Sequence, residues 1–212
     1  WSFDKFTYSV PPLEDTYTPA LSLKSSEINV GKTTTLTASI YAIHTTTKQY
    51  IVGDICYVFG TNWTMKYYRC LVDHMNQIPK DSYATTTDPD TGEVSYTETV
   101  YWQSIAPEEA VAFNTQTVGK YIFVNSGVVR VDRFISATQV SGEILVKLSA
   151  NIEAIARSWT IKEPIFNATF GYPRAITYFQ QRLVLAGSKK YPNYIWLSRT
   201  GDESNFLTTT LD

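Results

Sequence analysis

The sequence predicts a mainly β fold with very little helix. Of its 212 residues, 18% are charged and 14% are aromatic, and tyrosine alone occurs 15 times. Threonine occurs in runs at 33–35, 45–47 and 85–87. β-branched and aromatic residues favour strands, whereas Lys, Glu and Ala are less common there and are few here. These features together indicate strands joined by short turns.

The N-terminal part predicts an extended arm followed by a strand. Residues 1–19 contain Pro11, Pro12 and Pro19 and show little periodicity. Residues 33–41 then alternate, with Leu36, Ala38 and Ile40 on one side and Thr or Ser on the other. This period of two is typical of a half-buried strand.

Two later segments resemble each other. Residues 52–58 and 118–124 each begin with a Val-Gly pair that predicts a turn leading into a strand. After the second of them, residues 120–151 predict a three-stranded antiparallel meander, with its second turn at Ser141-Gly142. Seven similar residues leave open whether the chain contains a true duplication.

Two short motifs are interpreted as a helical turn and a hairpin tip. Residues 107–112, which begin with Pro and two Glu, are the only plausible helix, and it would be short. Residues 88–93 (Asp-Pro-Asp-Thr-Gly-Glu) offer oxygen ligands for calcium. Because the segment lacks the length and the final Glu spacing of an EF-hand loop, a hairpin tip is favoured.

Two histidines and two cysteines raise the question of a metal site. His44, Cys56, Cys70 and His74 are ligand types that zinc accepts, but only Cys70 and His74 have a usual ligand spacing. Cys56 and Cys70 are expected on opposite arms of a hairpin, which would allow a disulfide. Two buried free thiols, with no metal and no cofactor, are the preferred expectation.

The segment 171–206 is the most distinctive part of the chain. An apolar strand within residues 176–185 and a second at 194–197 flank a loop at 188–193, so a two-stranded hairpin is expected. Turn residues mark both ends of the segment. Arg182 is expected to form an ion pair with Asp202 and so fix the strand register.

This segment resembles large tail proteins of double-stranded DNA phages, in the tail tubular protein B or tail nozzle group. The resemblance is dense over about 36 residues, since those proteins have a Gly-Tyr-Pro-Arg turn, a Gln-Gln-Arg-Leu strand, and Ser-Arg-x-Gly-Asp followed by Asn-Phe. The matching residues are Gly171, Tyr172, Pro173, Arg174, Gln180, Gln181, Arg182, Leu183, Ser198, Arg199, Gly201, Asp202, Asn205 and Phe206.

The resemblance implies a β-propeller-like body with other β domains inserted in it. Residues 1–19 would then be an arm, 20–155 an inserted antiparallel β domain, and 156–212 a blade fragment of the larger body. It further implies a structural virion protein that is assembled in the host cytoplasm, forms a homo-oligomer, meets adaptor and fibre proteins, and lets DNA pass during ejection. The first residue is not Met and the chain stops soon after the hairpin, so both ends are expected to be cuts within a longer protein.

Residues 50–102 show a second resemblance, to small chitin-binding-type modules. The Tyr-x-x-Gly-Asp turn at 50–54, the Tyr-x-Cys strand at 68–70 and the closing Trp102 carry it, and a small β module at 50–105 is expected. In such modules aromatic faces stack on sugar rings, so Trp63, Tyr68 and Trp102 are the candidates for contact with a host glycan. The alternative is that these aromatic residues only fill a small core.

Charge and motif content favour a non-enzyme. The formal net charge is −2 and the pI about 5.7, which lacks the basic footprint of a DNA-binding domain but suits a conduit. No run of 18 apolar residues predicts a membrane span. No nucleophile elbow, phosphate-binding loop or His–Cys pair occurs, although scattered carboxylates leave a glycosidase pair open. No catalytic residue is therefore expected.

Overall fold

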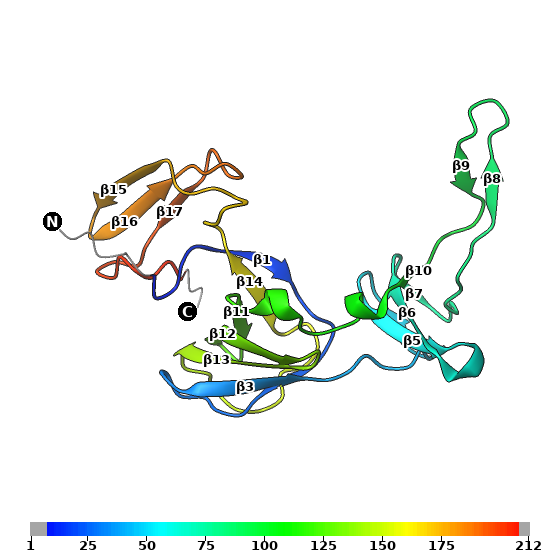
Figure 1. The fold of residues 1–212 in the computed structure, drawn as a ribbon, viewed down its shortest axis with the longest axis horizontal. Coiled ribbons are helices and arrows are strands. Elements are labelled where there is room, and N and C mark those ends of the chain that lie inside the picture. The colour runs from blue at the N-terminus through cyan, green and yellow to red at the C-terminus, as the bar shows by residue number, and fades with distance from the viewer. Residues whose placement is uncertain (1–7, 208–212) are drawn as a thin grey trace.

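The computed structural model describes residues 8–207, and these are mainly β, as the sequence predicts (Figure 1). The N-terminal strands are β1 (Leu13–Tyr17), β2 (Leu23–Ser25), β3 (Thr33–Ala38), β4 (Gln49–Tyr50), β5 (Ile55–Phe59), β6 (Met65–Cys70), β7 (His74–Met75), β8 (Thr85–Thr87) and β9 (Val94–Tyr96). The later strands are β10 (Trp102–Ile105), β11 (Tyr121–Val124), β12 (Gly127–Ser136), β13 (Gln139–Val146), β14 (Thr160–Pro164), β15 (Ala175–Phe179), β16 (Arg182–Ala186) and β17 (Ile195–Leu197). Three short 3₁₀ turns cover Thr61–Trp63, Pro107–Glu109 and Thr115–Thr117. Within residues 8–207, no helix has the length and apolar character needed to cross a membrane.

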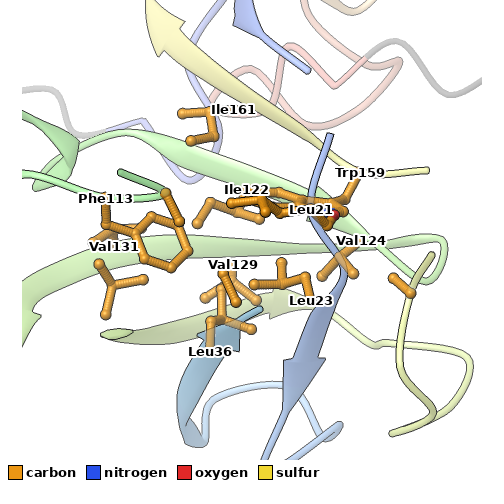
Figure 2. Close-up of a cluster of buried hydrophobic side chains, with 14 of the residues drawn as sticks. Leu21, Leu23, Leu36, Phe113, Ile122, Val124, Val129, Val131, Trp159 and Ile161 are labelled. Atoms are coloured by element: carbon orange, nitrogen blue, oxygen red, sulfur yellow. Dashed lines mark hydrogen bonds between the residues drawn. The ribbon is translucent and has the colours of Figure 1, made fainter. Parts of the chain in front are cut away.

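A seven-stranded antiparallel sheet forms the body, in the order β1-β14-β11-β12-β13-β3-β2. Its main core gathers side chains from several strands and from the loops beside them, as Figure 2 shows. Trp159 is fully buried there and donates its indole N–H to the Leu21 carbonyl at 2.7 Å. On β3, Leu36 and Ala38 are buried as the alternation predicts, whereas Ile40 lies beyond the strand and is exposed.

The expected meander is present as β11, β12 and β13, but its second turn is not at Ser141-Gly142. The chain reverses at Ala137-Thr138, and Gly142 lies inside β13 opposite Val131. A Cβ at Gly142 would lie 2.0 Å from the Arg130 carbonyl oxygen. This glycine therefore allows two backbones to approach closely, which is a common reason for glycine within a strand.

The two Val-Gly segments form the same local structure. Gly53 and Gly119 have φ values of +87° and +83°, so both occupy the left-handed region that a turn of this kind assigns to glycine. The Gly53 N–H donates to the Cys70 carbonyl at 2.9 Å, and the Gly119 N–H donates to the Val131 carbonyl at 2.8 Å. Each turn thus starts a strand already paired with its neighbour.

The expected small module is a unit with its own core. β5, β6 and β10 form a three-stranded antiparallel sheet, and β4 pairs with β7 beside it. Its own cluster of buried hydrophobic side chains is Tyr50, Cys56, Tyr68, Cys70 and Trp102, whereas Ile55 and Ile105 of the same sheet join the main core of the body. The Asp88–Glu93 segment is the tip of the hairpin formed by β8 and β9, as expected, and the Pro107–Glu109 turn is the short helical element foreseen.

The C-terminal unit differs from the expected two-stranded hairpin, because it has three strands in the order β15-β16-β17. The segment 176–185, expected to form one strand, contains parts of two strands, β15 and β16, which are joined by a turn at Gln180-Gln181. Both glutamines have positive φ, 48° and 60°, as in the type I′ turns that join hairpin strands. Because this turn contains neither Gly nor Asn, its residue types do not identify it as a turn.

The observed sheets do not follow the expected segment boundaries. Residues 1–7 of the expected arm lie outside the described residues, but residues 13–17 form β1 and pair with β14. The body sheet therefore joins strands from before residue 20 and after residue 155. Long-range strand pairing of this kind has no local sequence signal.

Candidate functional site: the C-terminal unit and the aromatic module

The first half of the phage-like motif builds turns at the start of the three-stranded unit. Gly171 has φ +83°, and a Cβ there would lie 2.7 Å from the Lys189 Cβ. Its N–H donates to the Asn167 carbonyl at 2.9 Å. The Arg174 N–H donates to the carbonyls of Ala186 and Gly187, which starts the pairing of β15 with β16. Tyr172 and Arg174 are exposed, and Pro173 is half-buried.

The second half of the motif closes the same unit. Ser198 is buried, and its Oγ accepts the N–H of Leu183 at 2.9 Å. Gly201, with φ +74°, donates its N–H to the Gln181 carbonyl and so holds the last turn against the hairpin turn. Phe206 packs with Leu183 in the unit's own core.

Arg182 does not pair with Asp202, in contrast to the expectation. Its Nε donates to the Thr200 hydroxyl at 2.9 Å, and the Asp202 carboxylate instead accepts from the N–H and hydroxyl of Ser204. Asp202 and Arg199 form only an isolated backbone bridge, and Asn205 accepts the Arg199 N–H through its carbonyl. Backbone pairing and the buried Ser198 hold the strand register. An ion pair made by the half-exposed Arg182 guanidinium would add little to stability, because solvent weakens exposed ion pairs.

Both faces of this unit and its outer edge carry uncovered apolar side chains, since Ile176 and Tyr178 share the face of Leu185 and Leu183, and Leu197 lies on the other. Leu183 and Leu185 are buried on the inner face, but β15 is exposed at every position. The exposed apolar side chains are Ile176, Tyr178, Phe179, Tyr194, Ile195 and Leu197. Such a concentration is typical of a contact surface rather than of a free one.

The sugar-stacking prediction is wrong for two of its three residues. Tyr68 is 2% exposed and Trp102 is 1% exposed, so neither ring can present a face to a sugar. The Trp102 indole N–H donates to the Gln77 carbonyl at 2.8 Å, and the Tyr68 hydroxyl donates to Asp81 at 2.5 Å. Burial raises the pKa of Tyr68 well above its usual value, and the bond to Asp81 adds to this. Tyr68 and Trp102 therefore belong to the core of the module, which agrees with the alternative that these aromatic residues fill a small core.

Trp63, the third candidate, is 82% exposed. It contacts Phe59 edge to face, with ring centroids 5.6 Å apart, and Phe59 contacts Tyr57 in the same way at 5.5 Å. Tyr57 and Phe59 were missed by the sequence reasoning. Their i, i+2 spacing places them on one face of β5, and the facing β6 residues are Tyr67 and Met65.

The two histidines both pack edge to face against Trp102. His44 stacks on Tyr50 at 5.2 Å, and His74 lies edge to face with Trp102 at 4.8 Å. Burial in this aromatic setting lowers the pKa of both imidazoles below the usual value. Among residues 8–207, no group of three or more His, Cys, Asp or Glu side chains is placed to hold a metal ion.

Cys56 and Cys70 are both buried and free. Burial raises the pKa of the Cys56 thiol to about 12 and also raises that of Cys70. The Cys70 thiol donates to the Val72 carbonyl at 3.1 Å. Neither thiol has the thiolate character that nucleophilic or redox chemistry needs.

An open cleft of about 600 Å³ lies between the module and the body. Its charged lining residues are Arg69, Glu108, Glu109 and Lys120. Arg69 lies 3.7 Å from Glu109, and Lys120 lies 3.3 Å from Glu163 just outside. Because these charges largely neutralise each other, the cleft has no excess of one sign that would attract a charged substrate.

Comparison with known proteins adds no relationship: no protein-family model matches the sequence, and no curated protein matches it.

Proposed function

We propose that this chain is a structural part of a phage tail, of the nozzle or tube type, which helps assemble the tail and lets DNA pass during ejection. The observation that carries the proposal is the use of the phage-like motif. Its glycines, glutamines, Ser198 and Phe206 occupy turns and core positions of one three-stranded unit. Residues that build a unit with an uncovered apolar face serve assembly rather than catalysis.

The chain's charge supports a conduit rather than a DNA-gripping role. With a net charge of −2, it offers little phosphate neutralisation, which is the main source of DNA affinity. DNA that passes through the tail would therefore bind only weakly to this part of the protein. In the proposed role the chain forms a homo-oligomer within the virion and meets adaptor and fibre proteins.

Immunogold labelling tests the proposal. Antibodies raised against the purified chain should decorate one end of tailed particles made from the genome that encodes it. Labelling absent from particles whose other tail proteins are detected would contradict the proposal. Antibodies adsorbed with the purified chain provide the matched control.

A second candidate function, glycan contact by the module, rests on Trp63 alone. The exposed indole is flanked by Phe59, and aromatic faces stack on the apolar faces of sugars. Because the two rings lie 68° apart, they form no flat platform, and one stacked sugar ring is the natural ligand. This contact would place the module at a host surface.

Glycan array binding tests the second candidate. Trp63→Ala should abolish saturable binding, because a single stacking aromatic often carries most of such an affinity. Met75→Ala, at an exposed position on β7 outside this aromatic row, is the control and should bind as the parent chain does. An absence of binding by the parent chain would remove this candidate and leave the structural proposal untouched.

A further inference from the structure

The hairpin formed by β8 and β9 lacks a core of its own. Every residue from 84 to 99 is exposed, and Figure 1 shows the hairpin projecting away from the rest of the molecule. It is held by main-chain bonds such as Asp88 N–H to the Glu93 carbonyl at 2.8 Å. A two-stranded hairpin is marginally stable in water unless something packs against it. A partner surface would remove this instability.

One face of this projecting hairpin, residues 84–97, is apolar. The pairs Thr85–Tyr96 and Thr87–Val94 lie on one face, and Thr86–Ser95 lies on the other. Val94 and Tyr96 are more than 60% exposed. The alternation would bury both side chains if the hairpin joined another sheet.

The C-terminal unit offers a complementary edge. β15 has no strand on its outer side, so its backbone groups on that side are unpaired within residues 8–207. Ile176 and Tyr178 form an exposed apolar row along this strand. An edge of this kind is a template for strand addition.

The two surfaces carry opposite charge. The hairpin carries Asp88, Asp90 and Glu93 and no basic residue. Residues 171–206 carry five basic residues (Arg174, Arg182, Lys189, Lys190 and Arg199) and two acidic ones, Asp202 and Glu203, so five minus two leaves a net charge of +3; Glu203 accepts the Tyr178 hydroxyl at 3.2 Å. Of the basic residues, only Lys190 has an ion pair within the described part of the chain, with Glu14. Arg174 precedes β15, whereas Arg182 lies opposite its last residue, so basic groups stand near both ends of the strand.

We propose that the hairpin of one copy pairs with the β15 edge of a second copy of this chain. The two surfaces lie at opposite ends of the molecule's long axis, so they cannot meet within one copy (Figure 1). The contact is therefore heterologous, and its repetition closes a ring or extends a filament. Main-chain pairing supplies affinity, the Val94–Tyr96 row continues the Ile176–Tyr178 row, and the opposite charges set the orientation. This contact rests on the proposed assembly function and names the surfaces that would perform it.

Crosslinking between two differently tagged populations tests this contact. One population carries Thr86→Cys on the hairpin and the other carries Thr177→Cys on β15. A bis-maleimide with a flexible spacer should give the mixed dimer in at least tenfold excess over the same mixture with Thr37→Cys, on the body sheet, in place of Thr177→Cys. The buried native thiols should give no product in the parent chain. Equal yields from the two mixtures, or hairpin–hairpin products as abundant as mixed ones, would overturn the proposal.

Sedimentation of variants provides the second readout. Replacing residues 85–96 by a short Gly-Ser turn should reduce self-association at least tenfold without unfolding the module, whose core lies elsewhere. Arg174→Glu should weaken association, whereas Arg133→Glu, an exposed body residue, should not. A parent chain that stays monomeric at millimolar concentration, or a deletion variant that associates as strongly as the parent, would refute the contact. Neither result would bear on whether the protein is found in virions, which the labelling experiment decides.

Discussion

At the scale of single residues, close backbone contacts and buried rings decide which positions tolerate change. Gly142 is the tightest case, because the Arg130 carbonyl oxygen occupies the place of a side chain. In the module, His44 and His74 fill aromatic space as neutral rings, and three of their nitrogens have no hydrogen-bond partner within residues 8–207. Both features follow from packing against residues distant in the sequence.

Gly142→Ala should destabilise the fold by about 2–4 kcal/mol, in the range expected when a strand backbone must shift to admit a methyl group. Gly60→Ala is the matched control, since its nearest neighbours are the ends of flexible side chains at 3.1 Å and beyond. Chemical denaturation of the two variants measures the difference. Equal midpoints would show that β12 and β13 separate at little cost.

The module should lose stability as the pH falls below about 6.5, the unperturbed histidine value. Both histidines have a lowered pKa in the folded state, so the unfolded chain binds protons first and acid favours unfolding. Stability falls from the unfolded-state pKa downward and levels off below the folded-state values. Tryptophan fluorescence during urea denaturation at pH 5 and pH 8 reports this, and His74→Phe should reduce the difference. A parent chain equally stable at both pH values would contradict the prediction.

At the scale of elements, some turns favour the strand pairing that follows them, and others take their conformation from it. The turns at Gly53 and Gly119 begin strands in the same way, with one N–H bonded across the ladder in each. The turn at Gln180-Gln181 has the opposite character, since two residues without turn preference adopt positive φ. Pairing of β15 with β16 imposes this conformation on the glutamines.

Replacing Gln180-Gln181 by Asn-Gly should therefore stabilise the C-terminal unit by about 0.5–1.5 kcal/mol, because those residues prefer type I′ geometry. The Asn-Gly variant keeps the loop length and both strands. Thermal unfolding followed by circular dichroism measures the change. Placing the same Asn-Gly pair at Thr45-Thr46, where neither residue has positive φ, is the control and should bring no gain. A destabilised hairpin variant would mean that the glutamine side chains make contacts of their own.

At the scale of the whole molecule, a buried carboxylate connects the module to the body. Asp54 is buried in the module, and its Oδ1 accepts from Arg157 of the body at 2.6 Å. Lys48 lies 3.9 Å from the other carboxylate oxygen. This ion pair lies beside the Gly53 turn, and together with the Arg69–Glu109 pair and the adjoining packing it sets the module's orientation.

Arg157→Ala should loosen the module and destabilise the fold by about 2–4 kcal/mol, because it leaves Asp54 buried with a weaker partner. The exposed Arg133, which has no ion pair in the described part of the chain, supplies the control, and Arg133→Ala should cost less than about 0.5 kcal/mol. Limited proteolysis between residues 39 and 54 should be faster in the Arg157 variant only. Similar cleavage of both variants would indicate that packing alone fixes the module.

The sequence by itself determined the local features of this protein. Alternation predicted β3, Val-Gly pairs predicted two turns, and the Asp-rich hairpin tip was recognised from its turn residues, because each signal resides in neighbouring positions. The mainly β class followed from composition for the same reason.

Only the tertiary structure decided which residues are available for function. Tyr68 and Trp102 carry the same aromatic chemistry as Trp63, yet the pairing of β6 with β10, in which Trp102 lies opposite Cys70, buries the first two, whereas Trp63 remains in solvent. Likewise, Arg182 faces Thr200 rather than Asp202 because the turn after β17 brings Thr200 to the start of β16, while the Asp202 carboxylate accepts from Ser204. The burial of a side chain and the identity of its hydrogen-bond partner depend on contacts between segments that are distant in the sequence. A local sequence pattern does not specify those contacts.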